Sequence, residues 1–178
     1  RVVIMAKRQR KNGERKLKST RFTDDYVIFN ATSFMCQWQR APFTVDEIKY
    51  MSAEQWMMAE KARLMGDEET LKLILNVKLD GGYKAAATCQ ALGRSVKPWD
   101  QQKWDKNKQN IVYQGTLHKF KQNPDMAKKL LSYDKNKSFV SYGDNPWGIG
   151  MDIWNKQANS KSNWRGQNLL GIIITMVR

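Results

Sequence analysis

The sequence is poor in the side chains that bind transition metals or build disulfide networks. Among 178 residues there are one histidine, His118, and two cysteines, Cys36 and Cys89. One imidazole leaves a zinc site short of ligands and excludes sites built on two histidines. The two cysteines could pair, but they make no disulfide framework, so we expect reduced thiols in an intracellular protein, cytoplasmic with a nuclear location left open. We therefore expect chemistry without a metal or any other cofactor.

Long hydrophobic runs are also missing. No apolar stretch approaches the roughly 18 residues that indicate a membrane span. The apolar part of RVVIMAKRQRK, at the beginning of the sequence, is too short for a secretory signal, and no small-residue cleavage pattern follows it. Apolar residues nevertheless make up 41% of the chain, and seven residues are tryptophan, as in a folded globule. We expect one domain with no membrane partner; its oligomeric state stays open.

Acidic side chains are few, and the excess of basic ones is uneven. The formal net charge is +14, and residues 1–22 contain nine Lys or Arg against one acid, Glu14. Asn12-Gly13 is a favourable two-residue hairpin turn, so we expect residues 1–22 to form a basic arm or ribbon ahead of a domain over 23–178. Such an arm can bind nucleic acid by releasing counterions. The alternative is a solvated segment that only aids solubility.

Turn and cap residues divide the remaining chain into short strands and longer helices. The closing segment GQNLLGIIITMVR (166–178) reads as a buried helix or strand, and its β-branched run from Ile172 to Thr175 favours a strand. The fold class is therefore α+β: a mostly helical single domain with a small β-sheet made by early and late strands. Strands are predicted at 25–30, on both sides of a turn at Asp46-Glu47 within 41–50, and at 138–143; helices are predicted at 53–66, 67–76, 81–93, 101–121 and 123–131.

The helix predicted at 53–66 has a well-marked beginning and end. Ser52 is a good N-cap, and Gln55 three residues later completes a capping box. Met51 and Trp56 occupy the positions of a hydrophobic staple, and Gly66 terminates the helix.

One face of this helix combines polar and apolar side chains unusually. Glu54 and Lys61 are seven residues apart and share a face with Met58 and Met65. A carboxylate and an amine between thioethers would suit the wall of a pocket. The alternative is an ordinary surface, with Glu54 stabilised by the helix dipole and Lys61 extending to solvent.

A loop within SYGDNPWGIGMDIW (141–154) is the second candidate. Three glycines and Pro146 fix its path and present Asp144 and Trp147 three residues apart. Loops of this kind often form the walls of binding sites. The alternative is a tight turn with Trp147 in the core.

Five segments in order resemble the NADAR family, which includes the YbiA-like N-glycosidases. They are PFTVDEIKYMSAEQWMMAEKARLMGDEE, ALGRSV, WDKNKQNIVYQGTLHKFKQNPDMAKKLL, DNPWGIG and WRGQNLLG, and the similarity runs from about Phe29 to Arg178. The chain departs from the family pattern at TSFMCQW (32–38), where Met35 and Cys36 replace commoner small polar residues.

The resemblance implies a NADAR/YbiA-like fold and hydrolysis of a ribose–base N-glycosidic bond without a metal. It implies that the carboxylates of Glu54 and Asp144 are catalytic, with Glu54 the more direct catalyst. A nearby carboxylate would stabilise the oxocarbenium-like state while a second group manages the proton and the water. An alternative is that Glu54 binds a ribose hydroxyl and water acts under Asp144. The remaining matched or candidate residues are Lys61, Arg94 and Lys119 for phosphate, Trp147 with Trp38 or Trp56 for base or ribose, and Asn168.

Several functions remain open at this level. The basic arm favours release of ADP-ribose from ADP-ribosylated guanine in nucleic acid or nucleotides. An alternative enzyme would cleave phosphoribosylamino-pyrimidine intermediates of riboflavin synthesis. Outside catalysis, the domain would be an ADP-ribose reader or a nucleic-acid-binding module that acts through residues 1–22.

Overall fold

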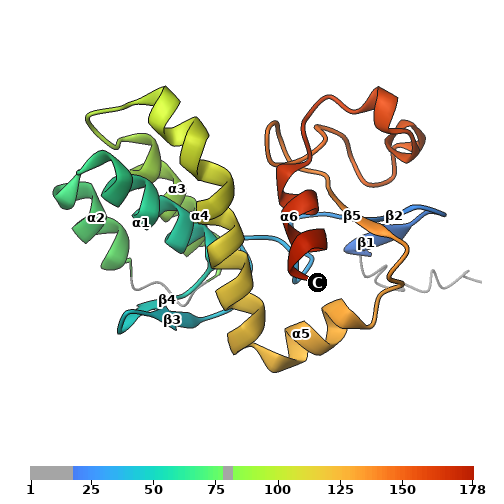
Figure 1. Cartoon of the computed structure of the whole chain (residues 1–178), viewed down its shortest axis with the longest axis horizontal. Helices are drawn as coiled ribbons and strands as arrows, with labels where there is room; N and C mark the ends of the chain where they lie inside the picture. Colours follow the sequence, from blue (N-terminus) through green and yellow to red (C-terminus); the bar gives the residue numbers. More distant parts are fainter. Residues whose placement is uncertain (1–17, 78–81) are drawn as a thin grey trace, which may run out of the picture.

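The structure is a computed structural model that describes residues 18–77 and 82–178 (Figure 1). The hairpin predicted at Asn12-Gly13 lies outside these residues. The secondary-structure elements are those of a mostly helical α+β domain, as predicted. In chain order they are β1 (Thr20–Phe22), β2 (Tyr26–Phe29), β3 (Phe43–Val45), β4 (Ile48–Tyr50), α1 (Ala53–Met65), α2 (Glu68–Leu75), α3 (Tyr83–Arg94), α4 (Gln101–Gln122), α5 (Pro124–Leu131), β5 (Ser138–Ser141), two 3-10 turns (Lys156–Asn159 and Lys161–Asn163) and α6 (Leu169–Val177).

Early and late strands form the main sheet, in the order β1-β2-β5. β2 pairs antiparallel with β1 and parallel with β5, with Val27 opposite Phe139. Neighbouring residues of β2 point to opposite faces, so Val27 packs in the large core shared with the helices, whereas Ile28 packs in a smaller core under the segment after β5. Three residues that the sequence placed in the basic arm, Thr20–Phe22, are the strand β1.

The helices lie mainly on one side of the molecule and the sheet on the other. In Figure 1, α1, α2 and α3 group together on the left, above the β3-β4 hairpin, while the sheet lies on the right beside α6. The long helix α4 passes between these halves and packs on both α1 and α6. No helix in the described part of the chain is long and apolar enough to cross a membrane.

The N-cap and C-cap of α1 and the hairpin turn before it are confirmed. Asp46 and Glu47 both have positive φ, at 47° and 64°, as a tight hairpin turn between β3 and β4 requires. Ser52 accepts a hydrogen bond from the backbone N–H of Gln55 at 3.2 Å. The Gln55 side chain returns not to the cap residue but to the N–H of Met51, at 2.8 Å. These bonds fix the first turn of α1, which carries Glu54.

The last element is the helix α6 (Leu169–Val177), so the prediction of a strand from the β-branched run Ile172 to Thr175 is wrong. Ile173 and Ile174 are buried while Ile172 and Met176 are 45% and 66% exposed, which is the pattern of one packed helical face. Helix α6 lies against β5, and the hydroxyl of Thr175 accepts a hydrogen bond from the N–H of Phe139 at 3.0 Å. Packing against β5 thus outweighs the modest preference of Ile and Thr for strands.

Gly171 allows this close contact between α6 and β5. A Cβ added there would lie 2.3 Å from the carbonyl oxygen of Phe139 and 2.4 Å from Oδ1 of Asn168. We expect Gly171→Ala to lower the free energy of unfolding by about 1–3 kcal/mol, because backbone must move to admit the methyl group. Denaturant unfolding measures this. Gly82→Ala is the control, since a Cβ at Gly82 meets no atom within 4 Å; equal losses in both variants would contradict the steric explanation.

Candidate active site

A cleft of about 350 Å³ lies between the helical half and the sheet half. Its walls come from α1, α3 and α4, from the connection after β2, from the end of β5 and the loop that follows it, and from the beginning of α6. Six of the eight predicted site residues line it, and they are Glu54, Lys61, Arg94, Trp38, Asp144 and Trp147. Lys119 and Asn168 do not line it.

Glu54 is the most unusual group in the cleft. The residue is only 3% exposed, and its Oε1 atom has no hydrogen-bond partner among the described residues. Burial raises the pKa of this carboxyl to about 7, against the opposing effects of the Trp38 indole and the charges of Lys61 and Arg94. Near neutral pH Glu54 is therefore divided between acid and carboxylate, which suits a group that transfers protons.

Lys61 lies on the same face of α1, as its spacing from Glu54 predicts. Its Nζ atom is 4.6 Å from the ring centre of Trp99 and 5.5 Å from that of Trp104. Partial burial lowers the pKa of the Lys61 ammonium, while the charge of Glu54 acts in the opposite direction. Met58 also lines the cleft, whereas Met65, on the same predicted face, is buried in the core.

The loop after β5 is fixed on both sides, as its glycines and proline suggest. The N–H groups of Leu169 and Leu170, at the start of α6, donate to the carbonyls of Pro146 and Trp147, each at 3.0 Å. A Cβ on Gly148 would lie 2.1 Å from the carbonyl oxygen of Gly143, so only glycine lets the two sides of the loop approach. The loop holds Asp144 exposed at the edge of the cleft and Trp147 half-buried in its wall.

Lys119 lies behind the cleft instead of in it. It is 1% exposed, and its Nζ donates to the carbonyl oxygen of Cys36 at 2.8 Å. Burial lowers the pKa of this ammonium to about 8. Lys119 is thus placed to hold the Cys36 backbone, two residues from Trp38, and it does not line the cleft.

Asn168 likewise has a structural environment. Its φ is 57°, and its side chain accepts from the N–H of Ser141 at 2.9 Å and donates to the carbonyl of Phe139 at 3.1 Å. The side chain therefore joins β5 to the start of α6. In this way Asn168 supports the loop that carries Asp144 without entering the cleft.

Trp56, the alternative aromatic wall, belongs to the core. Its indole donates to the carbonyl of Ile111 at 2.8 Å, and its ring packs against Phe43, Tyr50 and His118.

Cys36 and Cys89 are both free thiols. The described residues contain no group of three or more His, Cys, Asp or Glu side chains placed to hold a metal ion.

Several aromatic residues around the cleft were not predicted from the sequence. Tyr83, at the start of α3, is 65% exposed and its ring centre is 4.7 Å from that of Trp38. Tyr142 and Trp104 line the cleft, and Trp99 lies over Lys61. Tyr142 stands in the quoted loop segment and Trp104 in a segment that resembles the family, but no local pattern distinguishes them from core aromatics.

Known proteins resemble this chain over most of its length. The model of the NADAR domain matches residues 22–178. A protein named N-glycosidase R617, from Acanthamoeba polyphaga mimivirus, is 35% identical over 170 residues, which are 88% of this chain and 96% of the viral protein. Protein irg-1 of Caenorhabditis elegans is 31% identical over 134 residues, covering 74% of this chain and 60% of the nematode protein.

A solved structure shares the fold. The NMR structure of the Escherichia coli protein YbiA superposes with a TM-score of 0.65 at 18% sequence identity, over 90% of this chain and 86% of YbiA. At this identity the likeness supports the architecture and says nothing about the substrate. The domain match spans both halves of the molecule and every residue that lines the cleft, so this chain belongs to the NADAR family.

Proposed function

We propose that this protein is a hydrolase of N-glycosidic bonds whose substrate is ADP-ribose attached to guanine. Cleavage of an N-glycosyl bond rests on membership of the NADAR family and on the 35% identity with a viral N-glycosidase over nearly its full length. The single observation that carries the assignment to this cleft is Glu54, a buried carboxyl with an unpartnered oxygen on the cleft wall and a pKa of about 7.

The positions of the two carboxylates suggest how the work is divided. Cleavage of a ribosyl C–N bond leaves positive charge on the sugar, and a carboxylate in a dry wall stabilises that charge more strongly than one in water. Glu54 is buried in the wall, so we assign it to protonate the departing base and, as the carboxylate that this leaves, to stabilise the positive charge on the sugar. Asp144 is exposed at the edge of the cleft, where solvent water is available, and we assign it to activate the water that attacks the sugar.

The rest of the cleft supports a charged, ring-containing substrate. Lys61 and Arg94 supply two cations for a diphosphate, with the guanidinium able to make bidentate hydrogen bonds. Trp38 and Trp147 supply flat faces for a base or a ribose. The concentration of basic residues in 1–22 favours a substrate linked to nucleic acid.

The deciding experiment offers the protein three substrates in parallel and follows release of the base by mass spectrometry. They are ADP-ribosylated guanine in a DNA oligonucleotide, the corresponding free nucleoside, and a phosphoribosylamino-pyrimidine. We expect turnover of the guanine adducts, unchanged by a chelator. Exclusive turnover of the pyrimidine would replace this substrate assignment with the riboflavin-intermediate reading, and ADP-ribose binding without turnover of any substrate would make the domain a reader.

The role of the basic arm has its own test. Because Thr20–Phe22 form β1, removal of residues 1–17 alone leaves the sheet complete. We expect this truncation to leave turnover of the free nucleoside unchanged but to weaken binding of the modified oligonucleotide several-fold at moderate salt, with a shallower salt dependence. A full-length variant with Ser at each Lys and Arg of residues 1–17 is the matched control for charge. Equal oligonucleotide affinity in all three proteins would leave the arm no part in binding.

A further inference from the structure

Two opposite charges share the cleft without forming an ion pair. The ion pairs among the described residues are Arg63–Glu60 and Lys108–Asp105, and none joins Lys61 to Glu54. The two residues nonetheless line the same cleft from one helix face and influence each other electrostatically. A lysine has a long, flexible side chain that can adopt several directions, so the contacts of this ammonium decide whether it lies toward Glu54 or away from it.

Two indole rings make these contacts. The Lys61 ammonium lies over Trp99 and Trp104, at 4.6 Å and 5.5 Å from the ring centres, and the two rings are 6.1 Å apart at an angle of 49°. The faces of aromatic rings attract cations, and tryptophan does so most strongly. Trp104 is 9% exposed and set in the core, whereas Trp99 is 44% exposed and needs other contacts to keep its orientation.

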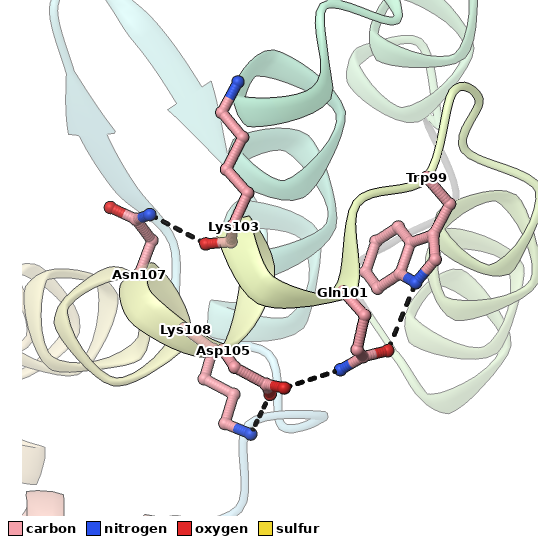
Figure 2. Close-up of polar contacts among 6 residues, drawn as sticks. All are labelled: Trp99, Gln101, Lys103, Asp105, Asn107 and Lys108. Atoms are coloured by element: carbon pink, nitrogen blue, oxygen red, sulfur yellow. Dashed lines mark hydrogen bonds and ion pairs between the residues drawn. The ribbon is translucent and has the colours of Figure 1, made fainter.

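A chain of polar contacts along α4 provides those contacts (Figure 2). The Trp99 indole N–H donates to Oε1 of Gln101 at 3.2 Å, and the Gln101 amide donates to Oδ2 of Asp105 at 3.0 Å. The other oxygen of Asp105 is paired with Lys108. Figure 2 shows this sequence of contacts ending at the Trp99 ring, so the indole is fixed from its polar edge while its face is turned to Lys61.

The backbone that carries Trp99 is fixed as well. The carboxylate of Asp67 accepts from the N–H of Thr70 at 2.9 Å to cap α2, and from the N–H of Lys97 at 2.8 Å. On the other side of Trp99, Asp100 caps α4 through the N–H of Lys103, at 2.9 Å. The short segment between α3 and α4 is thus tied down on both sides of Trp99, as a rigid support requires.

We propose that Trp99 is a positioning residue, which with Trp104 holds the Lys61 ammonium off Glu54 and keeps it available to an anionic substrate. The Gln101–Asp105 contacts act by orienting the ring. The proposal deepens the function proposed above, because the separated cation is the one assigned to the substrate phosphates. The charged groups facing Glu54 are Lys61 on its own helix, Arg94 on α3 and Asp144 across the cleft, with the thiols of Cys36 and Cys89 nearby.

The direct test follows the titration of Glu54 by carbon NMR in protein labelled at glutamate carboxyls, with Glu54→Gln used to assign the signal. In Trp99→Ala the ammonium is free to turn to Glu54, so we expect the midpoint of that titration to fall by about one pH unit or more. Trp99→Phe keeps an aromatic face but loses the bond to Gln101 that orients it, so its midpoint should lie between those of wild type and Trp99→Ala. Gln101→Met should give a smaller shift than Trp99→Ala.

Kinetics with the preferred substrate provide the second measurement. We expect Trp99→Ala to raise KM several-fold, because Lys61 no longer faces the anionic substrate, and to shift the pH profile of kcat/KM in step with Glu54. Trp154→Ala removes another tryptophan, 50% exposed and outside the cleft lining, and should leave both measurements unchanged. A folded Trp99→Ala protein with the wild-type Glu54 midpoint would overturn the proposal. The NMR titration needs no substrate, so failure of the proposed function would appear separately, as absence of turnover by the wild-type protein.

Discussion

Glu54→Gln is expected to lower kcat by roughly 10²–10⁴-fold, the usual contribution of a group that transfers protons in a transition state. The substitution keeps the size of the side chain and removes both its charge and its titratable proton. The site around it is built on fixed elements, because α1 begins at a capped turn and the facing loop is bonded to α6. The variant should therefore fold and bind ADP-ribose with nearly the wild-type affinity.

The measurement pairs single-turnover kinetics with calorimetric binding of ADP-ribose. Glu60→Gln is the matched control, since Glu60 lies on the same helix, outside the cleft lining, and pairs with Arg63. A Glu54→Gln protein with full activity would remove Glu54 from catalysis. If activity survived there and was lost in Asp144→Asn, the direct role would pass to Asp144, and Glu54 would be left to bind a ribose hydroxyl.

The same substitution is expected to change how stability depends on pH. Burial raises the pKa of Glu54 from 4.5 to about 7, so the folded protein holds this proton more tightly than the unfolded chain. The resulting stabilisation is fully present below about pH 4.5 and is lost as the pH rises through about 7. The shift corresponds to about 3 kcal/mol, at about 1.4 kcal/mol for each pKa unit.

Comparison of wild type with Glu54→Gln isolates this effect. Groups that titrate in both proteins, Lys119 included, largely cancel in the difference. Between pH 4 and pH 8, wild type should lose about 3 kcal/mol more stability than the variant, or roughly 6–12 °C in Tm for a chain of this size. Parallel stability curves for the two proteins would mean that Glu54 titrates alike in the folded and unfolded states. The wild-type cleft would then contain an ordinary carboxylate.

Local interactions explain which predictions succeeded. The cap at Ser52, the left-handed Gly66 and the turn at Asp46-Glu47 depend on atoms within a few residues of one another, so the residue types alone indicate them. The placement of Glu54 and Lys61 on one face follows from helix periodicity in the same way. The segments that resemble the family identify further cleft residues that local patterns do not indicate. Arg94 and Asp144, for example, lie far apart in the chain and both line the cleft.

Other outcomes depended on contacts between distant segments. The helix α6 replaced an expected strand because its buried face packs against β5. Lys119 and Asn168 resemble the other matched residues in sequence, yet their polar atoms are bonded to backbone groups 83 residues away in one case and 27 and 29 in the other. A family motif marks residues that line the cleft and residues that lie behind its walls alike, so the sequence does not separate them.

By itself, the sequence determined the class of fold, the two ends of α1, the basic character of residues 1–22 and the family. Each of these follows from a local pattern or from segments that resemble the family in the same order. Only the tertiary structure decided that Glu54 is buried with an unpartnered oxygen. It also decided that Lys61 lies over Trp99 and Trp104 instead of forming an ion pair with Glu54. Burial and the distances between charges arise when separate elements pack together, and they set both the pKa of Glu54 and the position of the cation beside it.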